Sequence, residues 1–74
     1  MSTNELVSIS VNGEERRFTP PVHLLDVLDV PAGEAAPRGI AVAVDGVVVP
    51  RGRHADTELR RGARVEIVTA VQGG

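Results

Sequence analysis

The sequence predicts an α+β fold in which a sheet of about five strands carries one main helix on a single face. Short segments that alternate apolar and polar residues are typical of half-buried strands. Asn12-Gly13 and Asp45-Gly46 mark two tight hairpin turns, because both central residues of such a turn need positive φ. Between the two hairpins, residues 19–30 change to a helical period.

The first hairpin is predicted from residues 6–18. The stretch LVSISV places Val7, Ile9 and Val11 on one face, as in a strand with one buried side. After the Asn-Gly turn, EERRFT runs back antiparallel. Its four charged residues indicate an edge or solvent-facing strand, and Phe18 is its one clear core anchor.

The helix is predicted within TPPVHLLDVLDV. Leu24, Leu25 and Leu28 form one apolar stripe, and Thr19 can serve as the N-cap ahead of two prolines. We expect about two to three turns that end before Pro31. The following stretch, PAGEAAPRG, is a loop by composition.

The second half of the chain is predicted to be mainly strands. IAVAV and VVV flank the Asp-Gly turn, and RGRHADTELRRG carries turn and short-helix signals with Asp56 and Thr57 as possible caps. RVEIVTAV is the last strand, in which Val65 and Ile67 point one way and Glu66 and Val68 the other. The order is β-β-α-β-β-β, with a single domain over residues 1–71 and a flexible tail over residues 72–74.

Composition narrows the function. The 74 residues include no cysteine, so neither a disulfide nor a thiolate metal site can form. His23 and His54 are too few for a zinc site without carboxylates, and each is expected at the surface. We predict no metal site and no bound cofactor. Phe18 is the single aromatic residue, which weighs against nucleic acid as a partner.

The start of the chain, MSTNELVSIS, has neither the basic region nor the long apolar run of a signal peptide. No stretch approaches the ~20 apolar residues that span a bilayer. A soluble, cytoplasmic protein without membrane contact is therefore expected.

All eight basic residues are arginine. Five lie in the last third of the chain, at Arg51, Arg53, Arg60, Arg61 and Arg64. They form either a docking surface for an acidic protein or an ordinary solvated face. Because there is no lysine, lysine-linked chains of this protein are excluded, although a genome-wide bias toward arginine codons accounts for the composition equally well.

The sequence ends on Gly73-Gly74, and Gly74 carries the α-carboxylate. That group is ionised at pH 7 and is a poor electrophile until another molecule removes its charge, most simply as an acyl-adenylate. Glycines suit the threading of a tail into a narrow site because they accept any φ and ψ. Ordering the tail costs ~1–2 kcal/mol per residue, so docking elsewhere must offset it. A frayed or accidental end is the alternative interpretation.

The docking surface is expected beside this tail. Val68 and Ala70 should face away from the helix-covered side of the sheet, and an apolar outer face there is typical of a partner contact. We predict partner contacts at Val68, Ala70 and Val71, with Gln72 and Gly73 as the flexible arm. An ordinary isolated surface valine is the alternative for Val68.

Three stretches resemble a known family. They are VNGEERRFTPPVHLLDVL, RGIAVAVDGVVVPR and LRRGARVEIVTAVQGG, and together they cover nearly the whole chain. They look like the ubiquitin-like β-grasp sulfur carriers, and above all the ThiS-type carriers of thiamin biosynthesis; VEIVTAVQGG is the most specific part. Gly62-Ala63 stands where that family often has Gly-Asp, the leucine stripe is shorter, and the loop after the helix is longer.

The resemblance implies a mixed sheet and a carrier that is not itself a catalyst. In that family an E1-like adenylating enzyme uses ATP to adenylate the terminal glycine, here Gly74. Sulfur that a desulfurase takes from cysteine then replaces the AMP, which gives a C-terminal thiocarboxylate. Thiazole synthase uses this sulfur to build the thiazole of thiamin. The free carrier is expected to be a monomer.

Other functions remain open. The small subunit of molybdopterin synthase has the same fold and tail chemistry, but its members tend to be longer, richer in Phe, and to carry a proline before the glycines. A protein-conjugating ubiquitin-like modifier and an interaction module with an idle tail are further alternatives. A β-grasp ferredoxin is excluded because there are no cysteines for an iron–sulfur cluster.

Overall fold

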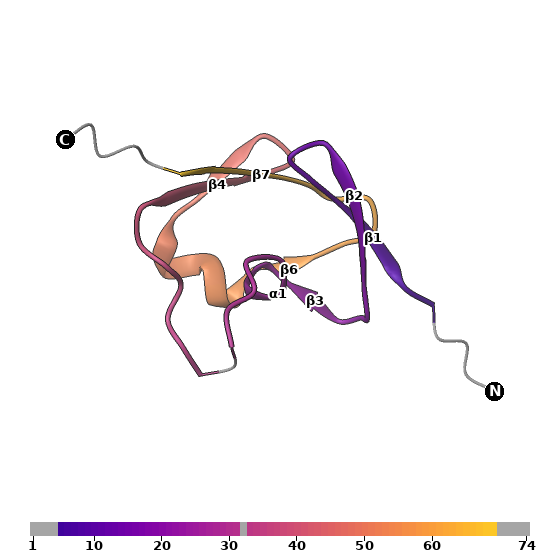
Figure 1. Ribbon diagram of the computed structural model, residues 1–74, viewed down its shortest axis with the longest axis horizontal. Coiled ribbons are helices and arrows are strands. Elements are labelled where there is room, and N and C mark those ends of the chain that lie inside the picture. Colours follow the sequence, from indigo (N-terminus) through magenta and orange to yellow (C-terminus); the bar gives the residue numbers. More distant parts are fainter. Residues whose placement is uncertain (1–4, 32, 70–74) are drawn as a thin grey trace.

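The computed structural model describes residues 5–31 and 33–69, and its main feature is a mixed five-stranded sheet with the order β2-β1-β7-β4-β5 (Figure 1). The strands of this sheet are β1 (Val7–Val11), β2 (Glu14–Phe18), β4 (Ile40–Val44), β5 (Val47–Val49) and β7 (Arg64–Thr69). A second, two-stranded sheet joins β3 (Val22–His23) to β6 (Glu58–Leu59). The helices are α1 (Leu24–Val27) and the 3₁₀ helix η1 (Arg51–Asp56), and with β3 and β6 they lie on one side of the large sheet (Figure 1).

Both predicted hairpins are present. Strands β1 and β2 pair antiparallel, as do β4 and β5. At the first turn Asn12 and Gly13 have φ of 51° and 83°, and at the second Asp45 and Gly46 have 51° and 85°. Positive φ at both central residues is what a two-residue hairpin turn requires, so the Asn-Gly and Asp-Gly signals predicted the turns correctly.

Strand β7 lies in the middle of the sheet. It pairs parallel with β1, where Val11 lies opposite Val65, and antiparallel with β4, where Ile40 lies opposite Thr69. The two hairpins therefore meet on the last strand of the chain. Because β7 runs parallel to β1, it ends at the edge where the Asn12-Gly13 turn lies, and the start of β1 and the end of β7 are on opposite sides of the molecule (Figure 1).

The core lies between this sheet and the elements on its covered side. Its largest fully buried side chains come from both halves of the chain and are Ile9, Val22, Leu24, Val42, His54 and Val65. Phe18 packs against this cluster from the edge strand, as predicted, and Arg16 covers its ring with the guanidinium 5.2 Å from the ring centroid. Burial of these aliphatic groups is the main stabilising term of so small a domain.

The helix is shorter than predicted. It forms one turn over Leu24–Val27, and Thr19 is not its N-cap, because Val22 and His23 form strand β3 ahead of it. The Leu24 N–H donates to the Thr57 carbonyl at 2.8 Å, which continues the pairing with β6 into the helix start. The expected two to three turns are therefore wrong: strand pairing holds the residues that a longer helix would need at its start.

The other end of α1 is closed by a left-handed residue. Asp29 has φ of 61°, and the Val30 N–H donates to the Leu25 carbonyl at 3.0 Å. A left-handed residue followed by such a bond is a common way to stop a helix. At the start, the His23 N–H donates to the Asp26 carboxylate at 2.8 Å and satisfies one of the free donors there.

His54 is not at the surface, where the sequence suggested it would be. The His54 side chain points from helix η1 into the core, and the exposed fraction of the residue is 1%. The ring Nε2 lies 2.9 Å from the Val49 carbonyl oxygen, which can only accept, so Nε2 carries the proton. Nδ1 is buried without a hydrogen-bond partner. Asp56 and Thr57 were predicted as possible caps. Asp56 is the last residue of η1, and Thr57 is its C-cap, whose hydroxyl donates to the Arg53 carbonyl at 2.7 Å.

Candidate functional site

The predicted reactive tail follows directly from β7. Ala70, Val71, Gln72, Gly73 and Gly74 lie outside the described residues, so their predicted roles stay predictions. The structure does describe the strand that leads to them and its surroundings. Val68 is the one predicted contact residue within this part of the chain.

Strand β7 presents two different faces. Val65 is fully buried and Ile67 half-buried, whereas Arg64, Glu66 and Val68 are exposed. Val68 has an exposed fraction of 63% and points away from the core. The predicted alternation along this strand is therefore confirmed, and Val68 lies on the open face of the sheet.

That open face is corrugated from strand to strand. The outward side chains are small on β1, where they are Ser8 and Ser10, and on β4, where they are Ala41 and Ala43. They are larger on the strands to either side. These larger outward residues are Glu15 and Arg17 on β2, Arg64, Glu66 and Val68 on β7, and Val48 on β5. We call the two rows of small outward side chains along β1 and β4 furrows, and β7, with its larger outward side chains, lies between them.

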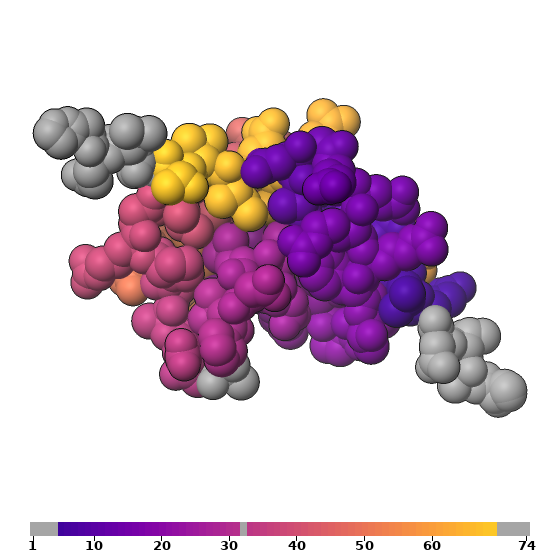
Figure 2. Space-filling view, in the orientation of Figure 1, coloured from indigo at the N-terminus to yellow at the C-terminus, as the bar shows by residue number. Residues whose placement is uncertain are grey.

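The furrow over β4 is apolar. Ala41 lies opposite Val68 on β7, and Ala43 lies opposite Val48 on β5. Val48 is 71% exposed. We call Ala41, Ala43, Val48 and Val68 the outer apolar patch. Exposed apolar side chains that gather in this way are typical of a protein–protein contact, and Val68 places this group next to the end of β7. Figure 2 shows the end of β7 in yellow on the surface of the molecule.

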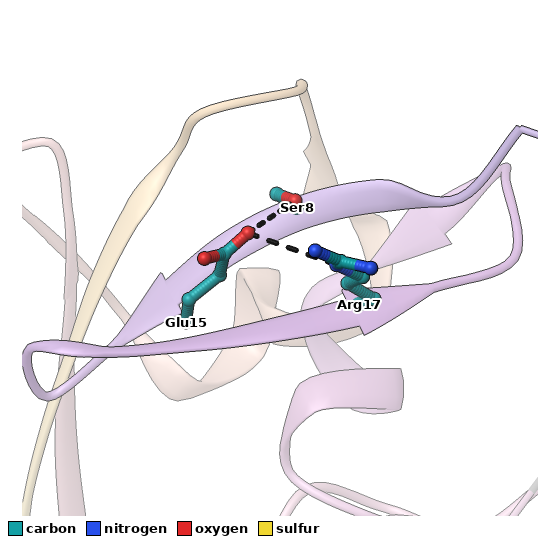
Figure 3. Close-up of polar contacts among 3 residues, drawn as sticks. All are labelled: Ser8, Glu15 and Arg17. Carbon is teal, nitrogen blue, oxygen red and sulfur yellow. Dashed lines mark hydrogen bonds and ion pairs between the residues drawn. The ribbon is translucent and has the colours of Figure 1, made fainter.

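The furrow over β1 is polar. The Ser8 hydroxyl donates to Glu15 Oε2 at 2.8 Å, and Arg17 Nε lies 3.8 Å from the same oxygen (Figure 3). All three groups are at the surface, where such an ion pair contributes at most about 1 kcal/mol. An open depression between this furrow and β7 is lined by Ser10, Asn12, Gly13, Arg64, Glu66 and Val68.

Both hairpin turns hold β7 in place. The Asn12 side chain accepts from the Ile67 N–H at 2.7 Å and donates to the Ile67 carbonyl at 3.2 Å. At the other turn, Asp45 Oδ1 accepts from the Arg64 N–H at 2.9 Å while the Asp45 N–H donates to the Arg64 carbonyl at 2.8 Å. The sequence marked these two residues as turn formers, and nothing in the pattern indicated their second role.

The arginines of residues 51–64 do not form one surface. Arg61 lies near the start of β7 and its guanidinium is 3.2 Å from the Glu5 carboxylate. Arg51 follows β5 at the opposite end, where β7 finishes, and Arg64 is on the open face between them. The arginines of this segment therefore lie at both ends of β7, and their role as a docking surface for an acidic protein stays a prediction.

The described residues, 5–31 and 33–69, hold no cluster of metal-ligating side chains. No three His, Asp or Glu side chains there are grouped as metal ligands would be. Over the same residues, no helix has the length and apolar character needed to cross a membrane. What the structure presents is a small domain whose open sheet face carries polar and apolar regions next to the end of β7.

Comparison with known proteins agrees with this geometry. The model of the ThiS family matches residues 5–74. The chain belongs to the ThiS family. Members of this family are small sulfur carrier proteins and not catalysts. The matched range includes all of β7 and runs through Gly73-Gly74.

A solved structure shows the same fold. The chain is similar to the thiamine biosynthesis protein (ThiS) from Geobacter metallireducens, with a TM-score of 0.66 and 23% identity over 92% of this chain and 100% of that one. This likeness confirms the predicted ubiquitin-like β-grasp architecture of the ThiS-family chain. A search of curated protein sequences with this chain found no match.

Proposed function

We propose that this ThiS-family chain carries sulfur for the thiazole of thiamin as a thiocarboxylate on Gly74. An E1-like enzyme adenylates the Gly74 carboxylate with ATP and releases pyrophosphate. A sulfur nucleophile, supplied from cysteine by a desulfurase, then attacks the acyl carbon and displaces AMP. Thiazole synthase receives this sulfur, and an oxygen from its substrate or from water replaces the sulfur on the acyl carbon, so the carrier returns with its carboxylate restored. The family match over residues 5–74 is the observation that carries the proposal.

The chemistry explains why the carrier needs help from an enzyme. A carboxylate with a pKa near 3.3–3.7 is charged at neutral pH, so a nucleophile is repelled and the oxygen is a poor leaving group. Adenylation removes the charge and supplies AMP as a leaving group. The chain has no cysteine, so no thiol side chain competes with Gly74 for the sulfur.

The folded domain serves as the handle in this proposal. Residues 1–71 form the domain and residues 72–74 the arm that enters the partner's site. The outer apolar patch lies at the base of the arm, because Ala41 is opposite Val68 and Ile40 is opposite Thr69. Contacts at Val68, and at Ala70 and Val71 beyond it, offset the cost of ordering the arm. The free carrier is a cytoplasmic monomer that binds no cofactor, nucleic acid or membrane.

Intact mass spectrometry tests the proposal. The protein is incubated with ATP, cysteine, a desulfurase and an E1-like adenylating enzyme that is competent with another ThiS-family carrier. The expected result is exchange of one oxygen for one sulfur, with AMP as the by-product. A variant that lacks Gly74 should gain no sulfur and unfold at the same temperature. The proposal is wrong if the full chain stays unmodified, or if the shortened chain acquires sulfur.

A separate experiment identifies the enzyme that accepts the sulfur from this carrier. The thiocarboxylate form is offered in parallel to thiazole synthase and to the large subunit of molybdopterin synthase. Loss of sulfur to thiazole synthase alone is expected. Transfer to the molybdopterin enzyme alone would keep the carrier chemistry and replace the acceptor.

A further inference from the structure

Two arginines outside the apolar patch lie at the base of the tail. The Arg51 Nε–H donates to the Ala36 carbonyl at 2.8 Å, and Ala36 is buried. Arg38 follows Ala36 by two residues and is exposed. The hydrogen bond therefore holds the guanidinium of Arg51 against the short turn that carries Arg38.

The strand register places this pair beside the exit of the tail. Arg38 precedes Ile40 by two residues, and Ile40 lies opposite Thr69, the last residue of β7. Strand β5 pairs with β4 on the side away from β7, and its last residue, Val49, lies opposite Val42. Arg51 comes two residues after Val49 and therefore lies at the same end of the sheet. Figures 1 and 2 show the loop and β4 segment next to the yellow end of β7.

Neither guanidinium has an acidic partner among the described residues. The ion pairs there join Arg17 to Glu15, Arg61 to Glu5 and His23 to Asp26. Glu34 lies in the same loop as Arg38, and its carboxylate makes no ion pair with either arginine. Both arginines are exposed, and both lie at the end of the sheet where β7 finishes. We call Arg38 and Arg51 the cationic rim.

We propose that the cationic rim docks against acidic side chains around the entrance of the site in the adenylating enzyme that receives the tail. The inference rests on the proposed function and adds the partner's surface chemistry to it. Charge complementarity at a rim steers the approach and sets the register of docking more than it adds affinity. The apolar patch supplies the contact area on the open face, and the rim fixes the position of the tail over the entrance.

The anion recognised is a carboxylate of the enzyme and not a phosphate of the nucleotide. Gly74 is the fifth residue after Thr69, and an extended segment of five residues spans at most about 17 Å. When the arm is extended in a narrow channel, the adenylate at Gly74 lies beyond the reach of a side chain at the base. The rim therefore meets the mouth of the channel and not its catalytic end.

A charge reversal at matched positions tests the proposal. Arg38→Glu and Arg60→Glu change the net charge equally, but Arg60 lies at the far end of the molecule, near the start of β7. ATP–pyrophosphate exchange is measured over a range of carrier concentrations. We expect Arg38→Glu to raise the KM for the carrier roughly tenfold at low salt with kcat unchanged, and Arg60→Glu to match the wild type. The difference should disappear near 1 M salt, where the screening length falls to about 3 Å.

A second pair of variants separates charge from structure. Arg51→Gln removes the charge, whereas Arg51→Lys keeps it while losing the Nε–H that bonds Ala36. If the adenylating enzyme recognises the positive charge at this position, Arg51→Lys keeps the wild-type KM and Arg51→Gln raises it. Thermal unfolding of all four variants shows whether the fold is intact.

The outcomes distinguish this inference from the function on which it rests. Equal KM values for Arg38→Glu and Arg60→Glu, or a salt-independent difference, overturn the cationic rim and leave the carrier function in place. A wild-type chain that is never adenylated overturns the carrier function, and the rim with it.

Discussion

The side chain of Asn12 takes the place of a neighbouring strand for Ile67. Strand β1 ends at Val11, and the chain then turns away from β7. The Asn12 amide bonds both the N–H and the carbonyl of Ile67, although 55 positions separate the two residues in the sequence. It thereby satisfies the β7 backbone one residue before Val68, close to where the tail begins.

We predict that Asn12→Asp destabilises the fold. Aspartate tolerates the positive φ of the turn and still accepts from the Ile67 N–H, but it presents an oxygen to the Ile67 carbonyl instead of a donor. The expected loss is about 1–3 kcal/mol of unfolding free energy, measured by chemical denaturation. Faster hydrogen exchange at the Ile67 amide should accompany it.

Asp45→Asn is the matched control at the other hairpin. It keeps the positive φ and the Oδ1 that accepts from the Arg64 N–H. The unfolding free energy should change by less than about 0.5 kcal/mol. Equal effects at the two turns would contradict the special role of the Asn12 donor.

Buried His54 should matter for stability, unlike His23. His54→Ala removes a fully buried ring and the donor to the Val49 carbonyl, so we expect a loss of roughly 2–4 kcal/mol. His23→Ala keeps the backbone N–H that bonds Asp26, and its side chain is half-exposed, so the change should stay within about 0.5 kcal/mol. Thermal and denaturant unfolding measure both. Similar small losses at both sites would place His54 at the surface after all.

Substitution by alanine should have different effects on stability at Gly46 and at Gly52. Gly46 has φ of 85° at the second hairpin turn, where a side chain is strained, and Gly46→Ala should cost about 1–2 kcal/mol. Gly52 in η1 has no positive φ and open space around its Cα, so Gly52→Ala should be neutral or stabilise by up to about 1 kcal/mol. The readout is the denaturation midpoint of each variant. A reversed order would show that the turn does not have the geometry described.

The outer apolar patch should affect docking and not folding. Val68→Ser removes exposed apolar area next to the tail, and we expect the KM of adenylation to rise roughly tenfold, which corresponds to about 1.4 kcal/mol. The unfolding free energy should stay within about 0.5 kcal/mol of the wild type. Leu6→Ser is the control, because Leu6 is also exposed but precedes β1 at the far end of the sheet. If both variants raise KM equally, the patch is not the docking surface.

Local patterns predicted the elements of the sheet well. The alternation of Val7, Ile9 and Val11 placed β1 and its buried face, and Asn-Gly and Asp-Gly placed both turns. These features depend on neighbours in the chain: side chains alternate across a strand whatever lies beside it, and a tight turn selects residues that tolerate positive φ. The outward direction of Val68 followed from the same alternation.

Distant partners decided what the patterns missed. Residues 22–23 read as the start of a helix, but their pairing with residues 58–59 makes them a strand. His54 looked like a surface residue because a lone histidine carries no signal of burial; the inward turn of η1 placed it in the core. In each case a contact with another part of the chain outweighed the local preference.

By itself, the sequence determined the hairpins, the alternation along the strands, the absence of thiols and amines from the side chains, and the Gly73-Gly74 ending that the family match includes. Only the tertiary structure decided that β7 lies between β1 and β4, that Asn12 and Asp45 hold it from either side, and that Arg51 bonds the Ala36 carbonyl in the loop that carries Arg38. The physical reason is the distance along the chain over which each kind of interaction acts. Turn and strand preferences act over a few residues, whereas these contacts join groups far apart in the chain and exist only once the sheet has assembled.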